Sequence, residues 1–68
     1  MPDRTLQTDR RRGRIRHLAR EAVSVARRKG LSGWDAYEAA KRHVRAEHGP
    51  HVPGYDAIIN RITDRLEI

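Results

Sequence analysis

Glycine and proline divide this chain of 68 residues into three segments, with breaks at Gly30, at Gly49-Pro50 and at Pro53-Gly54. Both residues interrupt helices, and glycine is the usual residue just after the last turn of a helix. Within each segment, apolar residues recur at intervals of three and four, which is the spacing of one helix face. A chain this short builds a single hydrophobic core. We therefore predict one all-α domain, a small three-helix bundle.

The bundle is expected to follow a flexible, Arg-rich N-terminal arm. Pro2 and the presence of only Leu6 as an apolar anchor indicate that the first residues do not pack against a core. The predicted organisation is an arm at residues 1–8 and a single domain at residues 9–68, with helices at about 9–29, 33–48 and 54–67.

Two starting points for the first helix remain open. Thr8 and Asp9 are both acceptable N-cap residues. However, the run Arg10-Arg11-Arg12 opposes the helix dipole, and Gly13 lowers helix propensity by about 1 kcal/mol relative to alanine. In the second reading, residues 10–14 stay unordered until a polyanion binds, and the helix begins near Arg14.

The second helix has the clearest start signal. Ser32 is a good N-cap residue, and Asp35 stands three residues later, in the position of a capping box. Glu38 precedes Lys41 and Arg42 by three and four residues, a spacing that predicts ion pairs on the solvent face of this helix.

The third helix has the most regular apolar stripe of the chain. Its residues follow helical spacing and not the alternation of a strand. The stripe suits either the core of a single chain or the seam of a homodimer, and both alternatives remain open: Tyr55, Ile58, Ile59, Ile62 and Leu66.

Positive charge is concentrated in the first half of the chain. Residues 1–30 contain ten basic and three acidic residues, a charge of +7, whereas residues 31–68 contain five basic and six acidic residues, a charge of −1. This asymmetry indicates an anionic partner. On the first helix, Arg16, Arg20 and Arg27 point in directions that lie within about 40° of one another. The side chains that we predict to bind the partner are Arg10, Arg11, Arg12, Arg14, Arg16, Arg20 and Arg27.

The segment Ala26-Arg27-Arg28-Lys29-Gly30-Leu31-Ser32 resembles the centre of a helix-turn-helix DNA-binding motif. In that motif a small alanine stands four residues before the glycine of the turn, and Leu-Ser follows it. Val25 also occupies an apolar position of the pattern. The resemblance covers residues 22–41 and implies that the second helix reads base edges in DNA.

Two residues depart from this pattern. Lys29 stands where an apolar residue is usual, and Gly33 weakens the start of the reading helix. The alternative is two helices joined by a glycine turn. The reading helix would also present an unfavourable set of side chains beside phosphates: Trp34, Asp35 and Glu38.

Several classes of function lack the residues that they require. No cysteine is present, which excludes disulfides, thiol catalysis and cysteine-based zinc sites. Ser24 and Ser32 have no sequence context for a nucleophile, and the isolated glycines form no phosphate-binding loop. We therefore expect no enzyme activity and no cofactor.

Histidines cluster near the end of the second helix. His48 and His51 flank a Gly-Pro turn, with His43 and Glu47 nearby. A metal site needs three or four ligands in fixed geometry, so we expect surface histidines and no metal. The chain contains no apolar run of about 20 residues and no apolar leader. We expect a cytoplasmic protein without a membrane partner.

The leading functional hypothesis is a small nucleic-acid-binding protein. The arginines of the first helix suit phosphate contacts, and the aromatic residues lie outside the basic half of the sequence. This separation favours backbone contacts on a duplex, DNA more than RNA, over base stacking on single strands. The alternative is a protein-interaction module that docks an acidic protein surface, such as an adaptor, an inhibitor or a phage-type accessory factor.

Overall fold

The computed structural model of this protein describes the backbone of residues 3–68 and the side chains of residues 10–68. It contains three helices, α1 (Asp3–Arg28), α2 (Gly33–His48) and α3 (Tyr55–Leu66), and no strand occurs among residues 3–68. The predicted all-α three-helix bundle is therefore confirmed. Within the same residues, no helix combines the length and the apolar character that crossing a lipid bilayer requires.

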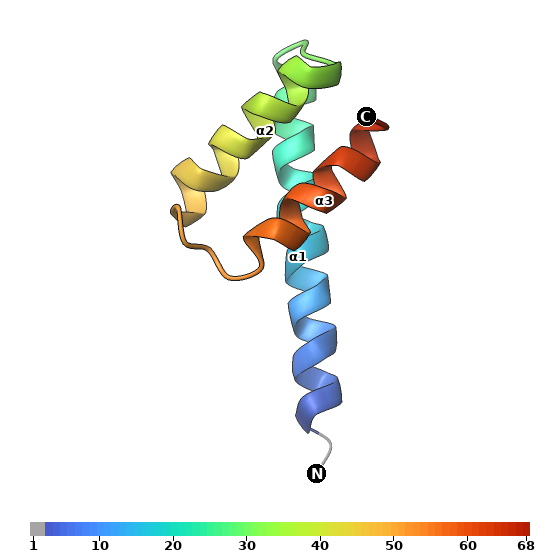
Figure 1. Cartoon of the computed structure of the whole chain (residues 1–68), viewed down its shortest axis with the longest axis vertical. Helices are drawn as coiled ribbons and strands as arrows, with labels where there is room; N and C mark the ends of the chain where they lie inside the picture. Colours follow the sequence, from blue (N-terminus) through green and yellow to red (C-terminus); the bar gives the residue numbers. More distant parts are fainter. Residues whose placement is uncertain (1–2) are drawn as a thin grey trace.

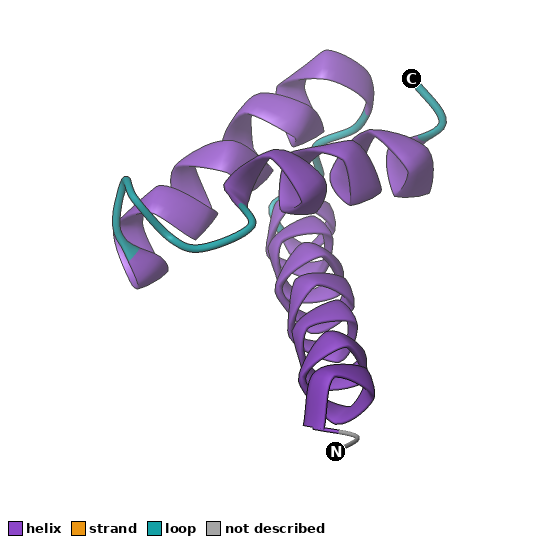
Figure 2. Cartoon of the chain, turned by 60° about the horizontal axis from the view of Figure 1, so that its bottom comes forward, coloured by secondary structure: helices purple, strands orange, loops and turns teal. Residues whose placement is uncertain are grey.

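The three helices pack together around the C-terminal half of α1 (Figure 1). α2 folds back from the end of α1, and α3 lies against both of the other helices. The N-terminal part of α1 projects away from this bundle, as Figure 2 shows from a second direction. The molecule is consequently elongated, with extents of 46, 23 and 17 Å.

Small side chains allow the helices to approach closely. Ala22 and Ala26 of α1 and Ala40 of α2 are completely inaccessible to solvent. Larger apolar side chains from all three helices fill the space between them, because burying each one stabilises the fold by about 1.5–3 kcal/mol. The core comprises Ile15, Leu18, Ala19, Ala22, Val23, Ala26, Ala36, Ala40, Val44, Ile58 and Ile62.

The apolar stripe of α3 serves the core of the single chain. Ile58 and Ile62 are completely buried, and Tyr55, Ile59 and Leu66 are partly buried against the same core. Two of the five stripe residues therefore have no surface left for a second copy. A homodimer through this stripe stays a prediction, and it would have to use the three partly buried residues.

The connection between α1 and α2 is a Schellman turn. Gly30 has a φ of 79°, its amide donates to the carbonyl of Arg27, and the amide of Leu31 donates to the carbonyl of Ala26. Ser32 is the N-cap residue of α2, but its side chain makes no capping hydrogen bond, so the predicted capping box is not formed. The reason is Gly33, whose φ of 55° departs from the regular first turn that the box requires.

Gly54 fixes the start of α3 against α1. Its φ of 77° lies in the left-handed region, and a Cβ atom at this position would lie 3.2 Å from Cδ1 and 3.3 Å from Cγ1 of Ile15. Glycine is therefore required here both for backbone conformation and for space. This contact places the first turn of α3 beside the first core residue of α1.

The first helix begins earlier than the sequence indicates. α1 starts at Asp3, before the expected starts at Thr8 or Asp9 and near Arg14, and it runs without interruption through Gly13. Residues 3–8 of the predicted flexible arm are thus helical, while Met1 and Pro2 lie outside the described residues. Gly13 costs helix propensity, but no proline breaks the backbone hydrogen bonds of the helix after Asp3.

We call residues 3–14, the part of α1 that precedes the core residue Ile15, the overhang. At 1.5 Å per residue it extends about 18 Å beyond the bundle. Neither α2, α3 nor the loop between them accompanies it (Figure 2). From Arg10 to Arg14 every residue of the overhang is exposed.

Candidate nucleic-acid interface

Arginines from two helices surround a shallow hollow beside the C-terminal half of α1. The hollow has a volume of about 420 Å³ and is lined by side chains of α1 and α3, with Val23 and Ser24 between the arginines. Nη2 of Arg27 donates a hydrogen bond of 3.3 Å to the main-chain oxygen of Arg65, which joins the two helices at this point. We call the four basic residues of this hollow the arginine groove: Arg20, Arg27, Arg28 and Arg65.

The basic surface continues from the arginine groove towards the overhang. Arg12, Arg16 and Arg20 follow one another at intervals of four residues, so they lie on neighbouring turns of one side of α1. All three side chains are exposed. Arg16, Arg20 and Arg27 were predicted to share one face of the first helix. At the C-terminal end of this face, α3 completes the arginine groove with Arg65.

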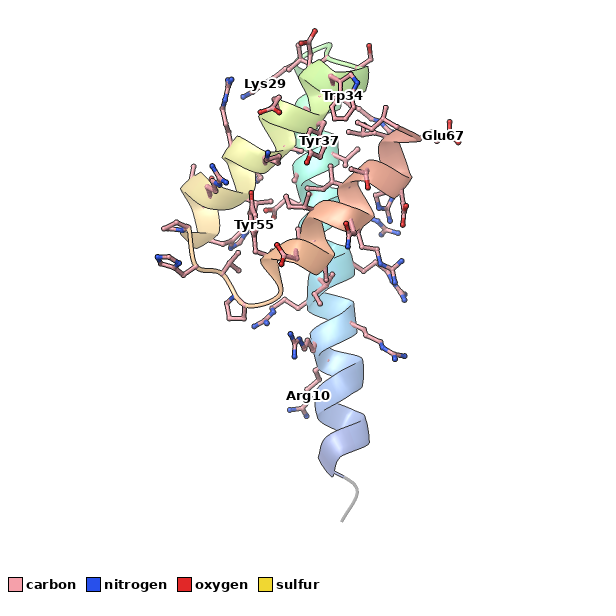
Figure 3. All side chains as sticks on the ribbon, in the orientation of Figure 1. Arg10, Lys29, Trp34, Tyr37, Tyr55 and Glu67 are labelled. Carbon is pink, nitrogen blue, oxygen red and sulfur yellow. The ribbon has the colours of Figure 1, made fainter. Side chains whose placement is uncertain are left out.

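The remaining predicted binding residues lie on the overhang. Arg10, Arg11, Arg12 and Arg14 are exposed there, at a distance from the arginine groove. Figure 3 shows Arg10 on this projecting part of α1, well away from the side chains of the bundle. The structure therefore places four of the predicted residues on the overhang and Arg20 and Arg27 in the arginine groove, with Arg16 between these two groups on the same helix.

The acidic side chains of residues 10–68 form no ion pair with these arginines. Among residues 10–68, the ion pairs of the structure join Glu21 to histidines, and none joins an arginine to an acidic side chain. Neighbouring like charges repel one another, so an exposed array of arginines is stabilised when an anion binds. Guanidinium groups are well suited to phosphate, because their planar donor fork forms paired hydrogen bonds.

Glu21 forms a separate polar cluster between α1 and α2. Its Oε2 lies 3.1 Å from Nε2 of His43 and 3.5 Å from Nε2 of His48. An ionised carboxylate only accepts hydrogen bonds, so Nε2 of His43 is the donor. This hydrogen bond is the main reason why the pKa of Glu21 is below its ordinary value; His48 acts in the same direction, and burial opposes both.

The fold separates His43 and His48 from Glu47. His43 and His48 turn towards Glu21 of α1, whereas Glu47, their sequence neighbour, is exposed and makes no ion pair in the described part of the chain. Within the same part, no group of three or more histidine, aspartate or glutamate residues is arranged to hold a metal ion. The cluster acts instead as a polar link between two helices.

The Glu21 cluster predicts a loss of stability in acid. Because the folded state holds the pKa of Glu21 below its ordinary value, this contribution is present above about pH 4.3 and is lost as the pH falls through the lower folded value. We expect the urea midpoint of the wild type to fall over this range. The Glu21→Gln variant should be less stable near pH 6 and should lose less on acidification. Parallel pH curves for the two proteins would contradict this role.

The aromatic residues gather on another side of the bundle, where α2 and α3 are neighbours (Figure 3). The rings of Trp34 and Tyr37 meet edge to face at 5.2 Å, and Trp34 remains 66 % exposed. Lys41 lies 5.0 Å over the ring of Tyr37, and Arg45 lies 5.4 Å over the ring of Tyr55. We call this set the aromatic surface: Trp34, Tyr37, Lys41, Arg45 and Tyr55.

The aromatic surface corrects one detail predicted for α2. Glu38 was expected to pair with Lys41 and Arg42, yet neither pair forms among the described side chains. Lys41 instead covers the ring of Tyr37. A cation over a tyrosine ring gains about as much as an exposed ion pair, without requiring a second long side chain to be held in place.

Sequence reasoning missed three residues of these sites. Arg65 joins the arginine groove although 38 positions separate it from Arg27. Neither Arg28 nor Glu21 is among the residues that the sequence predicts for a site. A wheel of α3 places Arg65 on the flank of the apolar stripe, but it does not show that this flank faces Arg27. No local signal pairs Glu21 with the histidines.

The comparisons with known proteins leave the geometry as the basis for assigning a function. No family model, curated protein or solved structure matches this chain.

Proposed function

We propose that this protein binds the phosphate backbone of nucleic acid, with duplex DNA as its preferred form, through the overhang and the arginine groove. The observation that carries the proposal is the row of exposed arginines along α1, none of which forms an ion pair with an acidic side chain of residues 10–68. Each arginine that contacts a phosphate releases a condensed counterion, so binding gains entropy and weakens with added salt. Arg65 of α3 adds a further arginine beside this row, in the hollow that it lines with Arg27 and Arg28.

The positions of the aromatic rings support a duplex over a single strand. Proteins that bind single strands stack bases on aromatic side chains within a basic groove. Here the arginine groove contains no aromatic residue. On the aromatic surface, the faces of Tyr37 and Tyr55 are each covered by a cation of the protein itself. Phosphate contacts therefore have to supply the affinity.

The distribution of charge between the helices favours α1 over α2 as the DNA-binding helix. In the helix-turn-helix reading, α2 enters the major groove with its N-terminal residues at the bases. Asp35 and Glu38 are exposed on this helix, and carboxylates beside phosphates are repelled. We propose that α1 makes the principal contacts and that the glycine turn serves to fold α2 back on it.

Fluorescence anisotropy with labelled nucleic acids tests the proposal. A duplex DNA, one of its single strands and a hairpin RNA are titrated at about 50 mM and about 200 mM salt. We expect the duplex to bind most tightly and its affinity to fall on the order of 10³-fold between the two conditions, as for six or more phosphate contacts. Absence of binding at the lower salt concentration, or binding that salt does not change, would contradict the proposal.

A second candidate function is supported by the aromatic surface. Trp34 is 66 % exposed and packs on Tyr37, and Arg45 of the same surface lies over the ring of Tyr55. Tryptophan, tyrosine and arginine are the residues enriched at the energetic centres of protein interfaces. In this function the protein is an interaction module, and the surface docks an acidic protein.

Trp34 is the only tryptophan of the chain and reports directly on this surface. After nuclease treatment of a cell extract, the interaction module should retain one acidic protein, and Trp34→Ala should lose it. Mixing the purified partner with the wild type should shift the tryptophan emission. Recovery of nucleic acid alone, by both wild type and variant, would count against this second function.

A further inference from the structure

Arginines of the overhang point to opposite sides of the helix. Successive helix residues are turned by about 100°, so the exposed side chains of Arg10 and Arg14 point within about 40° of each other, whereas Arg12 points about 160° away from both, with Arg11 between them. A helix that binds a flat anionic surface needs charge on one side only. Charge on opposite sides suits a site with anionic walls on two sides.

The dimensions of the overhang fit the major groove of duplex DNA. An α-helix with its side chains is about 10–12 Å wide, and the major groove is about 12 Å wide with a row of phosphates along each edge. The overhang's length of about 18 Å corresponds to about five base pairs. The described part of the chain places no other element beside it, so both groove walls have free access (Figure 2).

We propose that the overhang lies in the major groove of duplex DNA, with its arginines directed to both strands. The arginine groove of the bundle then contacts phosphates that lie outside the major groove. This inference rests on the proposed function and adds the binding mode to it. Regular double-stranded RNA is disfavoured as a partner, since its major groove is deep and narrow.

The energetics of the overhang agree with this mode. Short helices without tertiary contacts are marginal in water, and the adjacent arginines of the overhang repel one another. Phosphates on both sides remove this repulsion. Binding to duplex DNA is therefore expected to increase the helix content of the protein.

Chemical protection of the DNA tests where the overhang lies. Dimethyl sulfate methylates N7 of guanine, which faces the major groove, and N3 of adenine, which faces the minor groove. With a duplex saturated by the wild-type protein, we expect protection of guanine N7 over about five base pairs and unchanged adenine N3. Bound protein that leaves N7 reactive, or that protects N3 instead, would overturn the binding mode and leave the proposed function standing. Failure of the wild type to bind any duplex would overturn both.

Two substitutions at one position test whether the overhang acts as a continuous helix. Gly13 has no neighbouring atom within 4 Å of an added Cβ, so substitutions there do not disturb the bundle. Gly13→Ala favours the helix, whereas Gly13→Pro breaks it, and neither changes the charge. We expect Gly13→Ala to bind as well as the wild type or better, and Gly13→Pro to lose at least tenfold in affinity together with N7 protection.

Circular dichroism of both variants, alone and with duplex DNA, completes this test. The bundle should remain folded in each variant, because its core begins at Ile15. Helix content should rise on DNA binding for Gly13→Ala and remain nearly constant for Gly13→Pro. Equal affinity and equal N7 protection for the two variants would overturn the proposed groove helix.

Discussion

The Gly54→Ala variant is expected to lose about 2–3 kcal/mol of folding free energy. An alanine at a φ of 77° costs about 1–2 kcal/mol for the left-handed backbone alone. Its Cβ would also lie 3.2 Å from Cδ1 of Ile15, closer than ordinary contact, at the point where α3 starts against α1. In a domain of this size the loss corresponds to a fall in the melting temperature on the order of 10–20 °C, measured by circular dichroism.

Two controls separate the causes of this loss. Gly13→Ala places the same methyl group in open space on a regular helix, so it should not lower the melting temperature. Ile15→Val removes the Cδ1 atom that the new methyl would meet. In the Ile15→Val background, Gly54→Ala should therefore cost less than in the wild type by the share that the Cδ1 contact contributes, while the contact with Cγ1 remains. A wild-type melting temperature for Gly54→Ala would show that neither backbone nor contact restricts this position.

Local sequence signals predict the three helices. The structure departs from the predicted details at the starts of α1 and α2. The apolar spacing around Ile58 and Ile62 and the glycine breaks are sufficient to predict three helices and their approximate ends. They do not reveal that Gly33 adopts a positive φ, which prevents the capping box at Ser32. The start of α1 was placed too late, because unfavourable charge and one glycine reduce helix stability without ending the backbone hydrogen bonds.

The candidate interface was only partly accessible to sequence reasoning. Charge counting along the chain identifies the exposed arginines of α1, since they follow one another in sequence. It cannot identify Arg65, whose place in the arginine groove depends on how α3 packs against α1. Nor does it separate the overhang from the bundle, because that boundary is set by where the other helices stop and the core begins, at Ile15.

Removal of three arginines from the overhang is expected to weaken duplex binding by on the order of 10²-fold or more near 0.1 M salt. The variant replaces Arg10, Arg11 and Arg12 by alanine, and the proposed function assigns a phosphate contact to each of them. Each contact contributes about 0.9 to the slope of log K against log salt concentration. The triple variant should therefore show a slope smaller by up to about 3, measured by anisotropy at several salt concentrations.

The matched control removes three positive charges from α2 instead. Replacing Lys41, Arg42 and Arg45 by alanine changes the net charge by the same amount, so long-range attraction to the duplex falls equally in both variants. Only specific contacts then distinguish the two proteins. We expect the α2 variant to keep most of the wild-type slope, because its three residues lie outside the overhang and the arginine groove. Equal binding by the overhang variant and the wild type at every salt concentration would exclude the overhang from the interface. Equal losses in the two variants would instead indicate attraction by net charge alone.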